Sequence, residues 1–428
     1  MALCILDSFQ NYRKLLTMES NLKCRVCHSK DLKQFLSLGD IPPVNAFLDS
    51  SEISQERSYP LTLAYCPSCF LVQLESIVPP EHLFSHYLHL SSGSASNIEH
   101  LRNFSEILHA RFNITLDTSI LEIGSNDGTL LAFFKKYTSH LLGVDPAQNL
   151  MQLSQEHAIE TLPKFFNSSL ALDILKNKGA FDFIIALNVI PHTPDVIDLL
   201  EGVYTLLSLR GVLVMEGVYA LETILQGEFD TIYHEHVYTF SFHSLISTFK
   251  RAKLCIVDVE KIPTQGGSLR IFAQREESAS PPSPAVLALL KEEKEKGLTN
   301  PLIYQGVGAK VEKFKKDLRN LIEQETKQYG KLIGLGAPAR GNVILNYCGL
   351  GTQDIEYIID DTPLKQGKVT PGTHIPVKPW GALAHDNKRT FLLLSWNYKD
   401  SFFSKLKKQF SHSRVIIPFP HLEVNSLG

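Results

Sequence analysis

The sequence predicts an α/β fold made of two doubly wound units behind a small cysteine-rich domain. Three observations carry this prediction. An apolar run breaks into a Gly-rich turn and resumes as a helical pattern over residues 120–131, and the same order recurs over residues 332–342. Two Cys-x-x-Cys pairs lie near the N-terminus. A strand, a tight turn and a helix in this order open a βαβ unit, and 428 residues suffice for two or three domains.

Composition narrows the partners and the location. The formal net charge of -3 gives no electrostatic footprint for nucleic acid, and no apolar run reaches the ~20 residues needed to span a bilayer. Residues 1–7 lack the basic and apolar regions of a signal peptide. We therefore expect a cytoplasmic protein without nucleic-acid or membrane partners. Residues 1–17 show no pattern leading into the first motif, so we expect an extension or an early start codon ahead of Met18.

The first domain, expected over residues 18–80, is organised around its cysteines. Each Cys-x-x-Cys pair turns tightly enough for both sulfurs to reach one ion, and four thiolates close the shell of a tetrahedral Zn²⁺. The zinc is therefore expected to be structural, with no open position for chemistry. Disulfides are disfavoured in a cytoplasmic chain, and a redox motif would not explain two copies. The predicted ligands are Cys24, Cys27, Cys66 and Cys69.

The central unit is expected over residues 81–275. Ser96 and Glu99 predict a capping box that opens its first helix. Four apolar runs alternate with helical patterns further on, which predicts a parallel sheet covered by helices. The residues expected on the buried face of the first helix are Leu101, Phe104, Leu108 and Phe112. The predicted strands are residues 120–123, 141–144, 181–187 and 212–216.

The turn after the first of these strands is a candidate ligand cradle. Gly124 and Gly128 let the backbone approach a ligand, and Asn126 and Asp127 tolerate left-handed backbone geometry. Asp145 ends the next strand, where a carboxylate meets the two hydroxyls of a ribose. The turn is not a strict G-x-G-x-x-G, and its acidic residue would repel a pyrophosphate but not a cationic sulfonium. S-adenosylmethionine is therefore the predicted ligand, with NAD or a purely structural turn as alternatives.

Polar side chains also follow later strands, at the edge where doubly wound sheets bind ligands. Asn188 and His192 come after the strand 181–187, although a single histidine there is as often structural as functional. The run Tyr233-His234-Glu235-His236 gathers four titratable groups, and an imidazole beside a carboxylate can act as a general base. Metal binding by His234 and His236, on one face of a strand, and a purely structural cluster are the other interpretations.

The C-terminal unit is expected over residues 276–428, because a Pro-Ser-rich break over residues 278–284 marks a domain edge. A helical pattern over residues 307–329 has one apolar stripe, which predicts a helix packed on the core rather than a dimer seam. The turn 334–342 and the acids after the run 355–359 then repeat the layout of the central unit in degenerate form.

The second turn differs from the first in charge. Pro338 and Arg340 stand in the turn where the first has Asn126 and Asp127. Guanidinium and backbone N–H groups suit phosphate oxygens. The second unit is therefore expected to bind a different ligand, such as a nucleotide diphosphate.

Together these motifs resemble one family, the S-adenosylmethionine-dependent C-methyltransferases that methylate carbon 3 of nucleotide-linked 4-keto deoxysugars to make branched sugars such as mycarose. The resemblance covers nearly the whole chain from Met18. It implies a zinc-binding domain, a Rossmann-like class I methyltransferase domain and a C-terminal Rossmann-like domain, with the sugar nucleotide between the last two. Besides the cysteine pairs, its carriers are residues 38–39, 45–48, 122–128, 233–236, 266–270, 334–342, 346–349, 371–376 and 396–397.

The resemblance also implies a mechanism. The C4 ketone acidifies the hydrogen on carbon 3, a base removes it, and the enolate attacks the sulfonium methyl group. By similarity His236 is the base, supported by Glu235 and Tyr233, whereas Tyr87 and His192 orient the sugar or stabilise the enolate oxygen. The residues expected to hold the cofactor are Glu122, Gly124, Asn126, Asp127, Asp145 and Asn188, and those expected at the nucleotide end are Arg340, Asn342 and Lys365.

Two positions depart from the family pattern. His89 stands where the family often has a second aromatic residue, and Gln265 stands where a histidine precedes Gly266-Gly267. Both are expected near the sugar, so its identity stays open. The alternative function is an NAD-dependent nucleotide-sugar epimerase or oxidoreductase, although the central unit shows neither a strict dinucleotide fingerprint nor an evident Tyr-x-x-x-Lys pair. We expect a monomer or a weak homo-oligomer.

Overall fold

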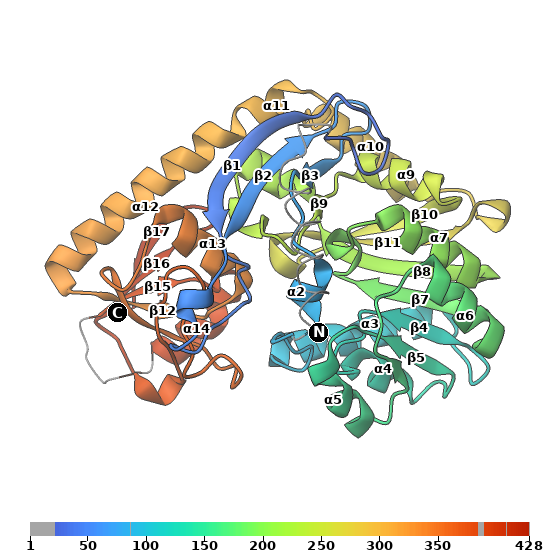
Figure 1. Ribbon diagram of the computed structural model, residues 1–428, viewed down its shortest axis with the longest axis horizontal. Coiled ribbons are helices and arrows are strands. Elements are labelled where there is room, and N and C mark those ends of the chain that lie inside the picture. Colours follow the sequence, from blue (N-terminus) through green and yellow to red (C-terminus); the bar gives the residue numbers. More distant parts are fainter. Residues whose placement is uncertain (1–21, 86, 384–388, 408, 428) are drawn as a thin grey trace, which may run out of the picture.

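A computed structural model describes residues 22–85, 87–383, 389–407 and 409–427. It contains a four-stranded, a seven-stranded and a six-stranded sheet. Figure 1 shows the seven-stranded central sheet on the right and the six-stranded C-terminal sheet on the left. The predicted extension and Met18 lie outside the described residues. None of the described helices is long and apolar enough to cross a membrane.

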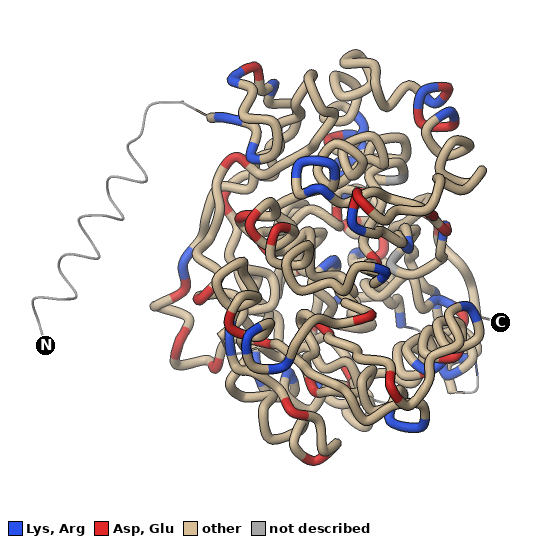
Figure 2. Tube along the Cα trace, turned by 90° about the vertical axis from the view of Figure 1, so that its right-hand side faces the viewer, with Lys and Arg blue, Asp and Glu red and all other residues tan. Residues whose placement is uncertain are grey.

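The charges are mixed over the fold. In the view of Figure 2, Lys and Arg are interspersed with Asp and Glu, in keeping with the formal net charge of -3. Several oppositely charged side chains pair on the surface, such as Lys327 with Glu323 on one helix, and Lys136, in the turn after a helix, with Glu106 on another. These exposed pairs contribute little to stability, since water screens them.

The N-terminal sheet is antiparallel and is completed by a strand from the central unit. Its order is β1 (Lys33–Ile41), β2 (Tyr59–Tyr65), β3 (Val72–Leu74) and β9 (Tyr238–Thr239). Strands β1 and β2 bury apolar side chains in one core with the C-terminal unit, whereas the cysteines share the core of the central unit. The N-terminal domain therefore packs against both of the other units.

The central sheet is doubly wound, as predicted. Its order is β10-β11-β8-β7-β4-β5-β6, in which β8 to β6 run parallel and β11 is antiparallel to both of its neighbours. The parallel strands read as continuous apolar runs because helices cover both faces. The strands are β4 (Ile120–Ile123), β5 (Leu141–Val144), β6 (Thr161–Leu162), β7 (Phe181–Leu187), β8 (Leu207–Val218), β10 (Leu254–Ile262) and β11 (Ser268–Arg275).

Helices form a separate core on each face of this sheet. Helices α3 and α4 bury their apolar side chains on one face, and α6, α7 and α9 bury theirs on the other. Short helices α2, α5 and α8 fill the connections. The bounds are α2 (Pro80–Phe84), α3 (Ala95–Phe112), α4 (Thr129–Phe134), α5 (Met151–Glu156), α6 (Ser168–Lys178), α7 (Val196–Leu206), α8 (Ala220–Gln226) and α9 (Phe242–Arg251).

The predicted capping box of α3 is wrong by two residues. Ser94, not Ser96, is the N-cap: its backbone is extended, and its hydroxyl accepts the backbone N–H of Asn97 at 3.2 Å. Glu99 lies inside the helix and pairs with Arg102. The helix nevertheless buries Leu101, Phe104 and Leu108 of the predicted stripe and half-buries Phe112, so the apolar spacing was a better guide than the cap.

The C-terminal unit repeats the strand-turn-helix layout, as predicted. Its sheet order is β14-β13-β12-β15-β16-β17, parallel except for β17 at one edge. The strands are β12 (Leu332–Leu335), β13 (Ile355–Ile359), β14 (Val377–Lys378), β15 (Thr390–Leu393), β16 (Arg414–Ile417) and β17 (Glu423–Ser426). The helices are α10 (Pro284–Glu295), α11 (Leu302–Gln305), α12 (Val307–Tyr329), α13 (Ala339–Cys348) and α14 (Lys399–Leu406).

Two helices cross between units in different ways. Helix α10 follows the expected domain edge, yet Val286 and Leu289 pack in the core of the central unit. Helix α12 buries Val311, Leu318 and Ile322 in the core shared by the C-terminal unit and strands β1 and β2. This apolar stripe faces the protein's own core, as predicted.

Candidate active site and metal centre

The four cysteines form one cluster through two matching knuckles. In each knuckle the backbone carbonyl of the first cysteine accepts the N–H of a residue with left-handed backbone geometry. His28 donates to Cys24, and Phe70 donates to Cys66. The Sγ atoms of Cys24 and Cys69 are 3.5 Å apart, and those of Cys27 and Cys66 are 3.4 Å apart. Tetrahedral Zn–S bonds require sulfurs at about 3.8 Å. Four thiol groups at this spacing fit a closed zinc site. These cysteines form the metal-binding cluster found among the described residues.

The cradle between β4 and α4 has the backbone that the sequence predicted. Gly124, Asn126 and Gly128 all have positive φ, which opens the turn above the sheet edge. Asp145, after β5, accepts the backbone N–H groups of Asn126 at 2.9 Å and Ala147 at 2.8 Å. These bonds hold its carboxylate at the rim of the turn, and its contact with a ribose remains a prediction.

Glu122 lies at the base of the same turn. Its side chain is buried, and its Oε2 atom has no hydrogen-bond partner among the described residues. Burial raises its pKa well above the usual value, and the charges of Asp127 and Asp145 add to this effect. A buried acceptor without a partner beside a glycine cradle fits a ligand that brings a donor and a positive charge.

Asn126 and Asp127 have a second task that the sequence did not predict. Asn126 accepts the backbone N–H of Ser91 at 2.9 Å and donates to the carbonyl of His89 at 3.0 Å. Asp127 accepts the N–H of Ser92 at 2.9 Å. The two side chains therefore tether the segment 89–92 over the cradle. Their direct contact with a cofactor remains a prediction.

Gly124→Ala is expected to lower the free energy of unfolding by about 1–3 kcal/mol and to abolish binding to the cradle. A Cβ at this position would lie 2.4 Å from Cγ2 of Val189, in a backbone with φ of 70°. Denaturant unfolding and titration with S-adenosylhomocysteine measure the two effects. Gly39→Ala is the control, since its φ is 79° but nothing lies within 4 Å of the added carbon. Equal behaviour of the two variants would contradict the prediction.

His236 is buried and has a defined tautomer. Its Nδ1 atom lies 2.6 Å from the carbonyl oxygen of Thr231. A carbonyl oxygen only accepts, so Nδ1 carries the proton and Nε2 presents a lone pair. Burial lowers the pKa of His236 to about 4, which keeps the imidazole neutral near pH 7. The rings of Tyr233 and His192 flank it, with centroids at 3.9 and 4.9 Å.

Glu235 receives hydrogen bonds on both carboxylate oxygens. Asn45 Nδ2 donates to Oε1 at 2.6 Å, and the Tyr87 hydroxyl donates to Oε2 at 3.1 Å. Burial raises the pKa of Glu235 to about 7, while these two bonds favour the ionised form. Asn45 comes from the N-terminal domain and was not among the predicted site residues. The only signal for it in the sequence was the family segment 45–48.

His192 and Asn188 lie beyond the end of β7, as predicted. His192 ends the short helix η3 (Ile190–His192) and stacks on Phe84. Its buried Nε2 atom is without a partner in the described part of the chain. Asn188 has positive φ and donates its backbone N–H to the carbonyl of Glu216. His192 thus faces the His236 ring with an unused nitrogen.

The interpretation of His234 and His236 as a metal pair on one strand is wrong. The run 233–236 is a turn rather than a strand. His234 Nε2 bonds the Tyr59 carbonyl at 3.2 Å, whereas His236 bonds Thr231. The two imidazoles are therefore committed to different carbonyl groups. Among the described residues, the cluster suited to a metal is the one of four cysteines.

The three residues predicted at the nucleotide end lie around the second turn. Lys365 is buried, donates to the Ala337 carbonyl at 2.9 Å, and has its pKa lowered by burial. Asn342 donates to the Val44 carbonyl at 2.7 Å, and its Oδ1 atom is without a partner in the described ranges. Arg340 is already engaged by carboxylates of the central unit. Their contacts with a nucleotide remain predictions.

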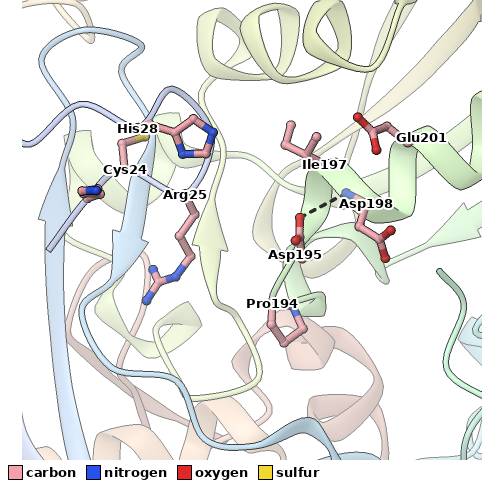
Figure 3. Close-up of a pocket in the computed structure, with 9 residues that line it drawn as sticks. Cys24, Arg25, His28, Pro194, Asp195, Ile197, Asp198 and Glu201 are labelled. Carbon is pink, nitrogen blue, oxygen red and sulfur yellow. Dashed lines mark hydrogen bonds between the residues drawn. The ribbon is translucent and has the colours of Figure 1, made fainter. Parts of the chain in front are cut away.

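A pocket of about 580 Å³ lies elsewhere, between the first cysteine knuckle and the start of α7. Figure 3 shows Arg25 and His28 on one wall and Asp195, Asp198 and Glu201 on the other. The carboxylate of Asp195 caps α7 by accepting the N–H of Asp198. None of the predicted catalytic or cofactor residues lines this pocket.

Comparisons with known proteins match the whole architecture. Three family models match in order: a zinc binding domain at residues 24–84, a methyltransferase domain at 121–213 and a C-methyltransferase C-terminal domain at 263–420. The chain is 32% identical over 407 residues to C-methyltransferase NovU of Streptomyces niveus, which covers 94% of this chain and 97% of that one.

The solved structures that match cover less of the chain. Magnesium protoporphyrin IX methyltransferase from Synechocystis is 14% identical, with 42% of this chain and 79% of that chain covered and a TM-score of 0.32. An S-adenosylmethionine-dependent methyltransferase from Clostridium acetobutylicum is 11% identical, with coverages of 42% and 92% and a TM-score of 0.34. On the family models and the long match to NovU, the chain belongs to the S-adenosylmethionine-dependent C-methyltransferases that carry an N-terminal zinc-binding domain.

Proposed function

We propose that the protein methylates carbon 3 of a nucleotide-linked 4-keto-deoxysugar through an enolate, in branched-sugar biosynthesis. The observation that carries this proposal is the neutral His236, whose Nε2 lone pair lies in a buried cluster with Tyr233, His192 and Glu235. A neutral imidazole with this tautomer has a lone pair available to take up a proton from the carbon next to a ketone. Membership of the family favours methyl transfer over the NAD-dependent alternative.

The residues divide the chemistry between them. His236 Nε2 takes the proton from carbon 3, a step for which general-base catalysis typically supplies ~10²–10⁴-fold. The Tyr87 hydroxyl donates its proton to Glu235, so its oxygen can accept from a sugar hydroxyl, and the His192 ring nitrogen can orient the sugar or stabilise the oxygen of the enolate. Glu235 holds the Tyr87 hydroxyl at 3.1 Å and so fixes its direction.

The cofactor would bind to the central unit, and the nucleotide would bind to the C-terminal unit opposite it. Bound S-adenosylmethionine supplies an electrophilic methyl group on a cationic sulfonium. Glu122 and Asp145 would hold its positive and ribose ends above Gly124. Lys365 retains donors beyond its bond to Ala337 for the anionic substrate. We also propose a cytoplasmic location, since four thiolates need a reducing compartment, and a monomer or weak homo-oligomer.

The test is to identify the methylated product. Zinc-loaded protein is incubated with ¹³C-methyl S-adenosylmethionine and a panel of nucleotide-linked 4-keto sugars, and the product is analysed by NMR. We expect the labelled methyl on carbon 3, together with exchange of the carbon 3 hydrogen in D₂O. The C4 ketone also acidifies the hydrogen on carbon 5. A labelled methyl on carbon 5 would therefore keep the enolate mechanism but contradict methylation at carbon 3. A labelled methyl on oxygen or nitrogen would contradict the enolate mechanism.

A further inference from the structure

Arg340 lies in a buried cluster that joins the C-terminal and central units. It stands at the start of α13, and its Nε and Nη2 atoms bond the two oxygens of Asp230 at 3.0 and 2.8 Å. Glu228 accepts from Nη2 at 3.4 Å. The guanidinium lies 4.4 Å from the Trp396 ring, whose indole N–H also bonds Asp230, at 2.8 Å.

The cluster fixes the segment that sets the tautomer of His236. Asp230 is the middle residue of the short helix η4 (Phe229–Thr231) and is completely buried. The next residue, Thr231, supplies the carbonyl oxygen that accepts the proton of His236 Nδ1. A shift of η4 by about 1 Å would stretch this bond beyond hydrogen-bond range. Either ring nitrogen could then carry the proton.

We propose that Arg340, through Asp230, is a positioning residue that holds His236 in the tautomer with a free Nε2. The proposal rests on the proposed function for the identity of His236 as the base. It replaces the predicted phosphate contact, because the two carboxylates already neutralise the guanidinium. It also places one determinant of the central unit's chemistry in the C-terminal unit.

The geometry explains why the residue is an arginine. Its planar fork meets both oxygens of Asp230 while its face stacks on an indole, which a lysine ammonium cannot reproduce. The turn before β11 is fitted to the same group. A Cβ at Gly266 would lie 3.0 Å from Arg340 Nη1 and 3.2 Å from the Trp396 ring. Three separate segments are therefore shaped around one side chain.

The test uses Asp230→Asn in the full-length, zinc-loaded protein. Asparagine keeps the volume and one acceptor for Trp396 but removes the charge that holds the arginine. Imidazole ¹⁵N spectra report the tautomer directly, and His236→Gln assigns the signal. In the wild type we expect one tautomer with Nδ1 protonated. In Asp230→Asn we expect a mixture of tautomers and a kcat lowered at least tenfold, with the KM for S-adenosylmethionine unchanged. Arg340→Lys is expected to show the same mixture.

The matched control is Glu325→Gln. Glu325 is also buried, pairs with Arg414 at 2.9 Å and accepts from Thr390, but it lies away from His236. We expect lower stability with an unchanged His236 signal. If Asp230→Asn and Arg340→Lys both keep the single wild-type tautomer, the proposal is overturned. If these variants change only the KM for the sugar nucleotide, Arg340 instead binds phosphate, as the sequence predicted. If His236 is not the base, His236→Gln stays active, although the tautomer of His236 still changes in Asp230→Asn. Failure of the proposed function therefore differs from failure of the positioning proposal.

Discussion

His236→Ala is expected to lower kcat for methyl transfer by about 10²–10⁴-fold while the Kd for S-adenosylmethionine stays the same. The variant removes the Nε2 lone pair that we propose as the base but leaves the cradle at Gly124 and Asp145 intact. Turnover assays and calorimetric titration measure the two quantities. Full activity in the variant would refute the assignment of the base.

His109→Ala serves as its control, because this histidine makes the same kinds of contact away from the site. Its Nδ1 bonds a backbone carbonyl, that of Ile114, at 3.1 Å, and its ring stacks on Tyr137 with centroids 3.9 Å apart. The two variants therefore each remove one hydrogen bond to a backbone carbonyl and one ring contact, although His109 is half-buried and His236 is buried. A drop in kcat that is confined to His236→Ala separates chemistry from stability.

The same residue gives stability a pH dependence with a defined sign. The pKa of His236 is about 4 in the folded protein and 6.5 without its surroundings. As pH falls below 6.5, His236 becomes protonated in the unfolded chain but stays neutral in the folded chain. The free energy of unfolding therefore declines toward pH 4. Above pH 6.5 both states are neutral and the contribution is complete. Relative to wild type, His236→Ala should lose less stability over this range.

Cys66→Ser is expected to unfold the N-terminal domain and to abolish methyl transfer with it. Structural zinc contributes about 10–16 kcal/mol of apparent free energy in zinc-finger peptides, which is as large as the ~5–15 kcal/mol that stabilises a typical domain. Loss of β3 would release β9, which begins two residues after His236. Bound zinc, thermal unfolding and turnover are the measurements.

The control for zinc loss is Cys255→Ser. Cys255 is half-buried in β10 of the central unit, far from the other thiols, so its loss should leave zinc content and activity unchanged. Retention of one zinc per chain and an unshifted unfolding curve in Cys66→Ser would show that the metal site is not the one built by the four cysteines.

The features that the sequence predicted well depend on short-range order. Apolar runs locate buried parallel strands, because both faces of such strands are covered, and the Gly-rich turn after β4 has the left-handed Asn126 that was expected. The cysteine knuckles were equally readable, since each closes on itself within a few residues. By contrast, Ser94 and Ser96 are chemically identical candidates for one cap, and only the folded backbone distinguishes them.

The features that sequence could not predict depend on contacts between distant segments. Asn45 meets Glu235, and Arg340 meets Asp230, only after three units have docked. The charge of Arg340 indicated a phosphate partner, because the carboxylates that neutralise it lie more than a hundred residues earlier in the chain. Polar side chains select their partners by proximity, which periodicity and composition do not encode.

The pairing of β3 with β9 also bears on the order in which the chain folds during synthesis. Three strands of the N-terminal sheet leave the ribosome early, but their fourth neighbour is Tyr238–Thr239. Most of the central unit must therefore be translated while the edge of β3 is still open. The zinc-binding domain consequently cannot be excised or grafted by cutting the gene at one point, because its last strand is encoded next to His236 in the central unit.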